Sequence, residues 1–333
     1  MMELAGVKYS VCIEDVEREM RSILYEADPL VHEYIALVAQ GVGKRLRPLL
    51  LIMFADLFGA PKPVNVTVSA ACCELLHTVS LIHDDVIDSA ETRRGLATLN
   101  NRFGNEAAVI VGDYILAQSF LRLAQLRDFT ILELTISASK KLGLGVIEEI
   151  RARDKLSLSA EKYYEMIGLK TGALFALVCE GGAYLGGADD TGMASAREFG
   201  RNLGLAFQVV DDLLDLTQSA CDAGKPTFSD LREGRITLPV IYAYETDAKQ
   251  TEALIGEYKE AYGDAQAQAI RGWLVESGAL KRALEDAGGL LSRARSELER
   301  ATGMCANPDK AAGILELTNQ VLARVPAWAR ERS

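Results

Sequence analysis

Apolar residues recur with helical spacing along almost the whole chain, and no other feature of the sequence limits the fold as strongly. The spacing predicts long helices over residues 66–88, 107–125, 130–155 and 193–217. Alternation of apolar and polar residues, which is typical of strands, is nearly absent, and so is a strand–helix–strand rhythm. The sequence therefore predicts an all-α protein.

Further helical patterns and two loops account for most of the remaining chain. The predicted helices cover residues 11–27, 48–58, 159–185 and a helical region 236–324, and the predicted loops cover residues 92–104 and 219–234. With 333 residues the chain is long enough to bury a large core. We expect one domain over residues 1–333.

Charge and cysteine content bear on partners and compartment. The 47 acidic residues outnumber the 36 basic ones, which gives a net charge of −11. Binding to nucleic acid requires a basic face, so nucleic acid is not expected as a partner. The six cysteines form no Cys-x-x-Cys pair, which is typical of reduced thiols in a cytoplasmic protein.

No targeting segment or membrane-spanning helix is predicted. Residues 1–10 lack a basic stretch followed by an apolar run. The apolar stretch 49–60 contains Asp56 and is too short to cross a bilayer, and the stretch 172–187 is rich in glycine and contains Glu180. We therefore expect a cytoplasmic protein without stable membrane insertion.

Two acidic clusters of the same pattern lie on predicted helices. They are Asp84-Asp85-Val86-Ile87-Asp88 and Asp211-Asp212-Leu213-Leu214-Asp215. Residues four positions apart lie on one face of a helix, about 5–6 Å from each other. Carboxylates at such short range repel unless a cation lies between them. Mg²⁺ takes oxygen ligands and commonly shares them with substrate phosphates. The clusters therefore predict a diphosphate held through Mg²⁺ between two helices.

Basic residues accompany the first acidic cluster. Arg93 and Arg94 follow it in a predicted loop, where guanidinium groups can bind phosphate oxygens through two hydrogen bonds. His77 lies on the same helix face as Asp84 and Asp88. Carboxylates for a metal beside arginines for phosphate are what a site that ionises a diphosphate requires.

Taken together, these motifs closely resemble those of the trans-isoprenyl diphosphate synthases, also called polyprenyl synthetases, and most of all the long-chain polyprenyl diphosphate synthases. The resemblance covers residues 41–324, and the tail 325–333 has no interpretation. The matching segments are 43–48, 77–88 with 93–95, 112–114, 170–172, 207–215, 224–226 and 230–239. Two Asp-Asp-x-x-Asp clusters in this order, with these basic motifs, are highly specific.

The resemblance implies an isoprenoid-synthase-type bundle of long helices around a central cavity. It implies condensation of an allylic diphosphate with isopentenyl diphosphate, Mg²⁺ as the cofactor, a homodimer, and transient membrane contact of an apolar product. Metal binding is carried over to Asp84, Asp85, Asp88, Asp211 and Asp215. Catalytic roles are carried over to Asp84, Asp85, Asp88, Lys170, Thr171, Gln208, Asp211 and Asp212.

Substrate binding is carried over in the same way. Isopentenyl diphosphate is assigned to Lys44, Arg47, His77 and Arg94, and the allylic diphosphate to Arg93, Lys170 and Lys225, with Arg235 as a further substrate-binding position. By contrast, Tyr163 and Tyr164 are interpreted as packing residues.

The resemblance also gives an expectation for product length. Bulky aromatic residues four or five positions before the first acidic cluster stop chain growth early, and here these positions hold Ser80 and Val79. Leu76, one helical turn further, and Phe120 on the following helix are candidate residues for the floor of the cavity. We expect a product longer than geranylgeranyl diphosphate (C20), with farnesyl or geranylgeranyl diphosphate as the alternative.

The chain departs from the family pattern in three segments. Val42 replaces a common glycine, and Arg235 replaces a lysine, which keeps the charge but changes its geometry. Of a Gly-Glu-x-x-Gln pattern only Glu149 is retained, and Ala152 at the glutamine position removes one polar contact from the predicted cavity.

Two alternative interpretations of the function remain open. A class I terpene cyclase also ionises a diphosphate with an aspartate motif, but its second metal motif is usually of an Asn/Ser/Glu type, and it needs no second diphosphate site. Non-catalytic subunits of hetero-oligomeric synthases generally lack the acidic motifs, whereas this chain keeps all six aspartates. A catalytic subunit that needs a partner cannot be told from a self-sufficient homodimer by sequence.

Overall fold

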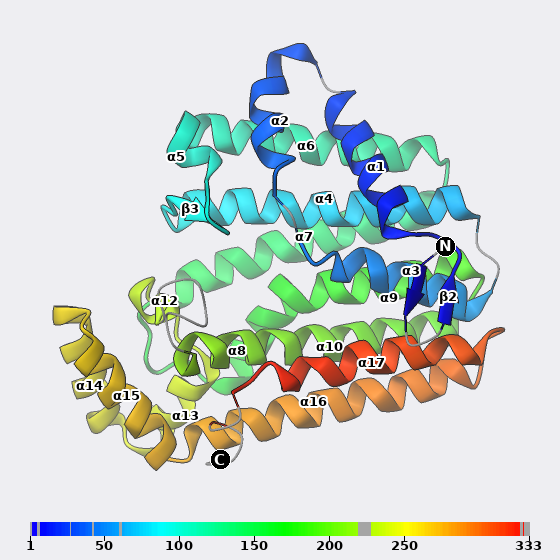
Figure 1. Cartoon of the computed structure of the whole chain (residues 1–333). Helices are drawn as coiled ribbons and strands as arrows, with labels where there is room; N and C mark the ends of the chain where they lie inside the picture. The colour runs from blue at the N-terminus through cyan, green and yellow to red at the C-terminus, as the bar shows by residue number, and fades with distance from the viewer. Residues whose placement is uncertain are drawn as a thin grey trace. The chain divides into compact units, whose positions relative to one another are not determined.

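The computed structural model describes residues 2–4, 7–26, 28–41, 43–59, 62–218, 228–326 and 329. These residues form two compact units. The first unit contains Met1–Lys140, Leu174–Gly200 and Glu297–Ile314, and the second contains Lys141–Ala173, Arg201–Ser296 and Leu315–Ser333. Helices dominate both units (Figure 1).

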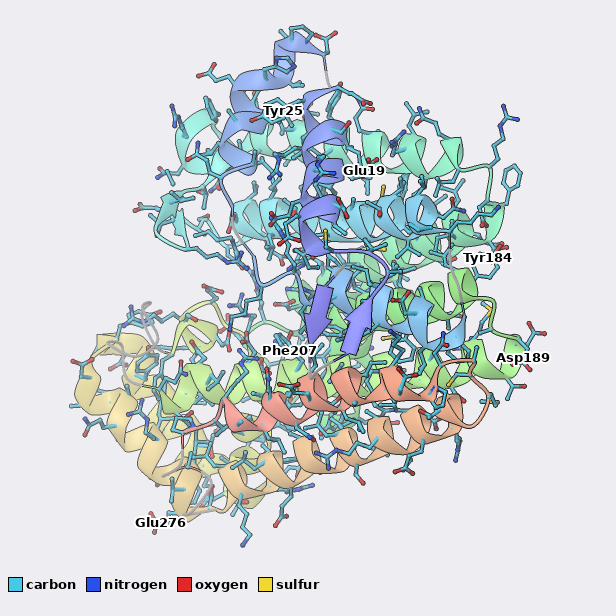
Figure 2. All side chains as sticks on the ribbon, turned by 45° about the vertical axis from the view of Figure 1, so that its right-hand side comes forward. Glu19, Tyr25, Tyr184, Asp189, Phe207 and Glu276 are labelled. Carbon is cyan, nitrogen blue, oxygen red and sulfur yellow. The ribbon has the colours of Figure 1, made fainter. Side chains whose placement is uncertain are left out.

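Helix α4 (Pro63–Ile87) is central to the first unit because α1 (Ile13–Tyr25), α3 (Leu46–Phe58) and α6 (Asn105–Gln125) all pack against it. Ten of the thirteen residues of α3 are buried, which makes this helix apolar on all sides and part of the core. An ion pair ties α1 to α6, where Arg122 Nε lies 2.6 Å from an oxygen of Glu19. Figure 2 labels Glu19 on α1.

The other elements of the first unit up to α9 include α7, which also contributes residues to the second unit. They are β1 (Met2–Leu4), β2 (Val7–Tyr9), η1 (Pro29–Val31), α2 (His32–Val38), β3 (Thr92–Arg93), β4 (Leu96–Ala97), α5 (Leu99–Phe103), α7 (Phe129–Ala152) and α9 (Ala173–Gly186). The described residues include two antiparallel hairpins, with Met2 opposite Tyr9 in one and Thr92 opposite Ala97 in the other.

The second unit contains the chain around the second acidic cluster. Its elements are α8 (Ala160–Ile167), η2 (Gly168–Gly172), α10 (Asp190–Thr217), α12 (Ser229–Arg232), α13 (Leu238–Thr246), α14 (Ala248–Ala261), α15 (Asp264–Glu276), α16 (Ala279–Thr302) and α17 (Ala311–Ala323). Helices α10, α16 and α17 also contribute residues to the first unit, and η3 (Pro308–Lys310) belongs to the first unit entirely. Helix α8 contacts η2 and α13, and α14 packs between α13 and α15.

The all-α prediction is confirmed, but three local predictions were wrong. The described part of the predicted loop 219–234 contains α12, whose first turn is capped by Asp215, which accepts from Ser229 N at 3.1 Å. The predicted loop 92–104 contains the β3–β4 hairpin and α5, because Thr98 caps the helix by accepting from Asn101 N at 3.3 Å. The predicted single helix 159–185 changes to π-helical geometry over Gly168–Gly172. Single-domain folding and cytoplasmic location stay predictions.

Within the part of the chain that the structure describes, three helical segments are long and apolar enough, by length and composition, to cross a membrane. The prediction that no helix spans a membrane rested on stretches 49–60 and 172–187 and did not include these segments. They are Pro63–Ile87, Asn105–Gln125 and Ala160–Gly186, and 67%, 33% and 61% of their most apolar windows are buried inside the protein. Packing within the chain therefore accounts for most of the apolar surface of the first and third segments.

Candidate active site

A cluster of arginines surrounds the middle of α4 in the first unit. Arg45 has a left-handed backbone conformation (φ 51°) and starts α3. Its Nη1 lies 3.1 Å from Oε1 of Glu74 on α4, and its Nε lies 3.3 Å from Oε1 of Glu17 on α1. This residue is therefore held by carboxylates from two helices.

Arg47 lies deeper than Arg45, with its guanidinium carbon 4.8 Å from the ring centroid of Phe175. Burial, assisted by the nearby Arg94 and opposed by Glu74, lowers the pKa of Arg47 to about 10. Its Nε is buried and has no hydrogen-bond partner among the described residues. A buried cation with a spare donor favours an anionic ligand, because an unpaired buried charge is costly.

His77 lies among these cations. Burial, followed by the charges of Arg47, Arg94, Arg93 and Arg45, lowers the pKa of His77 well below its usual value. The ring is therefore neutral in the folded protein at neutral pH. A neutral imidazole can donate one hydrogen bond to an anion, while the neighbouring arginines supply the positive charge.

Arg94 occupies the turn between β3 and β4 with a left-handed backbone (φ 53°). A methyl group built on Gly43 would lie 3.2 Å from Arg94 Nη1 and 3.4 Å from Arg45 Nη1. The arginine of the turn thus reaches the segment that precedes α3. Lys44, in that same segment, is exposed.

The first acidic cluster ends α4, and its aspartates differ in environment. Asp88 N donates to Asp84 O at 2.8 Å, so these two residues are one helical turn apart. Asp85 is buried and receives Nε and Nη2 of Arg93, each 2.7 Å from Oδ1. Burial raises the pKa of Asp85, and Arg93 opposes that effect.

The motif Gly112-Asp113-Tyr114 on α6 supports the same end of α4. A methyl group on Gly112 would lie 2.4 Å from His83 Nε2, so only glycine allows the ring to pack there. Asp113 Oδ1 lies 3.6 Å from the same nitrogen. Tyr114 hydroxyl accepts a hydrogen bond from Asp28 N at 3.0 Å. The structure thus gives this motif a packing role, which the sequence alone left undefined.

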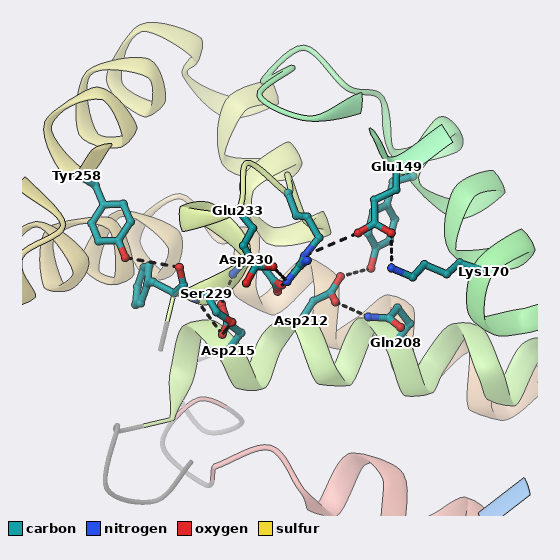
Figure 3. Close-up of polar contacts among 12 residues, drawn as sticks. Glu149, Lys170, Gln208, Asp212, Asp215, Ser229, Asp230, Glu233 and Tyr258 are labelled. Atoms are coloured by element: carbon teal, nitrogen blue, oxygen red, sulfur yellow. Dashed lines mark hydrogen bonds and ion pairs between the residues drawn. The ribbon is translucent and has the colours of Figure 1, made fainter. Parts of the chain in front are cut away.

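In the second unit, Lys170 and Arg235 share one buried carboxylate (Figure 3). Lys170 Nζ lies 2.5 Å from Oε2 of Glu149, and Arg235 Nε lies 3.8 Å from its Oε1. Arg235 also binds Asp230 Oδ1 at 2.9 Å and pairs with Glu233. Arg235, which replaces the lysine of the family pattern, therefore supplies a planar guanidinium group that contacts three carboxylates.

The π-helical segment η2 positions Lys170 and Thr171. A methyl group on Gly145 of α7 would lie 2.6 Å from Lys170 N, so the two backbones are in direct contact. A π-helical insertion shifts the side chains that follow it, and such insertions are frequent at functional sites. The contact at Gly145 fixes where this shift occurs.

Asp212 is engaged entirely by protein groups. Its Oδ2 accepts from Tyr163 hydroxyl at 2.5 Å, and its Oδ1 accepts from Gln208 Nε2 at 2.8 Å. Thr171 hydroxyl donates to Gln208 Oε1 at 2.7 Å. Burial and the charge of Asp230 raise the pKa of Asp212 well above its usual value, while the two donors oppose that rise.

Asp211 and Asp215 face different partners. Asp211 is exposed and lies 3.0 Å from Arg324 Nη2. Asp215 is buried and accepts from Ser229 N, Ser229 Oγ and Asp230 N at 3.1, 2.7 and 3.2 Å, which caps α12. Burial and the charge of Asp215 raise the pKa of Asp230 to about 7, against the influence of Arg235.

The acidic side chains of the two clusters are the candidate ligands for Mg²⁺. Among the described residues no group of three or more His, Cys, Asp or Glu side chains is arranged to hold a metal ion. Asp84 and Asp88, one turn apart, offer oxygen ligands only. Mg²⁺ is usually bound through one or two carboxylates plus substrate phosphates, so these residues fit the ion in that mode.

The predicted chain-length residues lie in the first unit. Leu76 and Val79 on α4 are buried, at 3% exposure each. Ser80 is partly buried and donates to His77 O at 2.7 Å. Phe120 on α6 is also partly buried. Their role in product length stays a prediction.

Within each unit, the structure brings the predicted residues together. The first unit holds Arg47, His77, Arg93 and Arg94 near the first acidic cluster, and the second holds Lys170, Thr171, Gln208 and Arg235 near the second. Lys225 and the departure Val42 lie outside the described residues. Tyr163 is buried in the core, as expected of a packing residue, and its hydroxyl also binds Asp212 across 49 positions of sequence.

A model of the polyprenyl synthetase family matches residues 28–271 of the chain. The chain belongs to the polyprenyl synthetase family. A curated member, octaprenyl diphosphate synthase of Haemophilus influenzae, is 35% identical over 256 residues, which cover 76% of this chain and 78% of that protein. Geranylgeranyl diphosphate synthase of Sulfolobus acidocaldarius is 38% identical over 210 residues, which cover 61% and 63% of the two chains.

A solved polyprenyl synthetase structure supports the same assignment. Polyprenyl synthase from Caulobacter crescentus, crystallised with calcium and isoprenyl diphosphate, aligns with a TM-score of 0.82 and 31% identity over 96% of this chain and all of that one. The predicted family and the isoprenoid-synthase-type all-α fold are confirmed. The predicted enzyme class, a prenyltransferase, is confirmed by membership of the family.

Proposed function

We propose that this polyprenyl synthetase condenses an allylic diphosphate with isopentenyl diphosphate, repeatedly, to an all-trans polyprenyl diphosphate longer than C20. The observation that carries the proposal is the cluster around His77. His77 is on α4, the helix that carries the first acidic cluster. Arg47 of α3 lies beside it with a buried, unpartnered Nε, and Arg45 and Arg94 are close by. This basic cluster can bind an anion in addition to a metal-bound diphosphate. An enzyme that binds only one diphosphate would not need it.

Each group has a defined task in this reaction. Lys44, Arg47, His77 and Arg94 bind isopentenyl diphosphate, and Arg93, Lys170 and Lys225 bind the allylic diphosphate. Cationic donors stabilise the charge that develops on the departing diphosphate as the carbon–oxygen bond breaks. The double bond of isopentenyl diphosphate then attacks the allylic cation, and loss of a proton completes the longer allylic diphosphate. Burial around Thr171 and Asp212 limits access of water, which would quench the cation.

Mg²⁺ is proposed as the cofactor, with Asp84 and Asp88 as ligands in the first acidic cluster and Asp211 as a ligand in the second. Bound there, the ion would neutralise diphosphate charge and support ionisation. Asp85 and Asp215 join as ligands only if they leave Arg93 and the N-terminus of α12. Asp212 has both oxygens engaged by Tyr163 and Gln208 and acts as a support.

A homodimer is proposed through the apolar side chains on α6 and the start of α7. Ile110 and Phe129 are 66% and 81% exposed, and Val109, Leu121 and Ile136 are exposed as well. Exposed apolar side chains in such number mark an interaction surface, and a second copy is the commonest occupant. Light scattering should give twice the mass of 36.2 kDa, and Ile110→Asp should give the monomer.

The test of the reaction is turnover of purified protein with Mg²⁺, isopentenyl diphosphate and geranyl, farnesyl or geranylgeranyl diphosphate, with products sized by mass spectrometry. A ladder that ends beyond C20 supports the proposal. An end at C15 or C20 keeps the reaction and refutes the product length. A cyclic hydrocarbon formed without isopentenyl diphosphate refutes the reaction, and absence of turnover refutes a self-sufficient enzyme.

A further inference from the structure

A chain of three hydrogen bonds runs from a buried tyrosine to the threonine beside Lys170. Tyr163 hydroxyl donates to Asp212 at 2.5 Å, Gln208 Nε2 donates to Asp212 at 2.8 Å, and Thr171 hydroxyl donates to Gln208 Oε1 at 2.7 Å. Figure 3 shows the bond between Gln208 and Asp212. Tyr163 is 1% exposed and Asp212 is 5% exposed. The chain therefore joins α8, α10 and η2 inside the second unit.

The direction of each bond is fixed by its neighbour. An amide NH₂ group donates but does not accept, so the bond between Gln208 Nε2 and Asp212 Oδ1 runs from Gln208 to Asp212. The amide of Gln208 then has its oxygen toward Thr171, and the Thr171 hydroxyl must donate its single proton to it. What Thr171 offers to any other group is a lone pair.

This polarity has a consequence for the proposed reaction, on which the inference rests. A lone pair stabilises an allylic cation, whereas an O–H directed at the cation opposes it, because the hydrogen carries partial positive charge. We propose that Tyr163 is a positioning residue that, through Asp212 and Gln208, fixes the Thr171 hydroxyl with its lone pairs toward the reacting centre. Tyr163 itself acts only through these partners.

The adjacent tyrosine provides a matched control. Tyr164 hydroxyl binds Asp286 at 3.0 Å, and its ring packs edge-on against Tyr163 with centroids 5.5 Å apart. Both tyrosines therefore donate to a carboxylate within the second unit, but the partner of Tyr164 has no contact with Gln208 or Thr171 among the described hydrogen bonds. Loss of either hydroxyl removes a hydrogen bond to a carboxyl group, but only the bond of Tyr163 belongs to the series that leads to Thr171.

The experiment compares Tyr163→Phe with Tyr164→Phe, each in the native chain and in a Thr171→Val background, by steady-state kinetics with both diphosphates. Tyr163→Phe should lower kcat by about tenfold or more and leave both KM values within about twofold. In the Thr171→Val background the same change should lower kcat by less than about threefold, because residues of one network are not additive. Tyr164→Phe should leave kcat within about twofold. Urea unfolding of all variants separates lost stability from lost turnover.

The inference is overturned if Tyr163→Phe lowers kcat equally with and without the Thr171 hydroxyl, or no more than Tyr164→Phe does. Should Tyr163→Phe not fold, Gln208→Leu takes its place in the same cycle, because it breaks the chain one step closer to Thr171. Additive losses from Gln208→Leu and Thr171→Val would equally refute it. A native protein without turnover refutes the proposed function, which distinguishes that failure from failure of the inference.

Discussion

Arg93 binds Asp85 through two donors, with Nε and Nη2 each 2.7 Å from Oδ1 of the carboxylate. The carboxylate side chain is 8% exposed and the arginine side chain 39%. The proposed reaction requires Arg93 for the allylic diphosphate and Asp85 for the metal. The ion pair must therefore open when substrate and metal bind, and it holds both groups close to their places until then.

Arg93→Gln should raise the KM for the allylic diphosphate by about 10–100-fold, since a charge-assisted hydrogen bond contributes about 1.5–3 kcal/mol. The KM for isopentenyl diphosphate should change far less. Initial rates at varied concentrations of each substrate measure both. Arg18→Gln, which removes a comparable pair with Asp15 at the surface, is the control. Equal effects on the two KM values would argue against the assignment of Arg93.

The neutral state of His77 predicts how stability depends on pH. Its pKa is lowered in the folded protein, so below the unfolded value of about 6.5 the unfolded chain binds the extra proton. The unfolding free energy therefore falls as pH falls through that value, by up to about 1.4 kcal/mol per pH unit from this group. His77→Gln should remove this part of the dependence.

Urea unfolding at about pH 7.5 and about pH 5.5 tests the prediction. The difference in unfolding free energy between native protein and His77→Gln should shrink by roughly 1 kcal/mol at the lower pH. Carboxylates titrate in both proteins and largely cancel in that difference. If it were the same at both pH values, His77 would not be held neutral by the surrounding arginines.

Sequence could predict the helices and the residue types of the site because both depend on local spacing. The acidic clusters, Arg93, Arg94 and Lys170 are read from short motifs. The π-helical segment Gly168–Gly172 could not be predicted. It arises where α7 contacts the backbone at Lys170 through Gly145, and contacts between distant segments leave no mark on local periodicity.

Contacts over long sequence separation were beyond prediction for the same reason. Tyr163 carries an apolar ring at a core position of α8, so its pattern is that of any packed tyrosine. Its bond to Asp212 depends on how two helices are placed. Likewise, nothing in the sequence indicates that Asp215 caps α12 while Asp211 stays exposed, because both occupy equivalent places in one motif.

Two glycines of α7 should respond in opposite ways to alanine. A methyl group on Gly145 would lie 2.6 Å from Lys170 N, whereas one on Gly143 would meet nothing within 4 Å. Gly145→Ala should destabilise the protein by about 1–3 kcal/mol through overpacking and lower kcat by displacing η2. Gly143→Ala should stabilise it by about 0.5–1 kcal/mol, the gain of alanine over glycine in a helix. Thermal unfolding and turnover of both variants measure this, and a harmless Gly145→Ala would contradict the close contact.

Ser80 gives a direct test of product length. It lies one turn before Asp84 on α4 and donates to His77 O at 2.7 Å. Ser80→Phe places a ring one turn, about 5.4 Å, below the first acidic cluster, so products should end earlier than in the native enzyme. Ser80→Ala removes only the hydroxyl and should leave the product distribution unchanged. Mass spectrometry of the products compares the three proteins. Shortening by both variants would assign the effect to the lost hydrogen bond, and shortening by neither would show that the growing chain does not pass this face of α4.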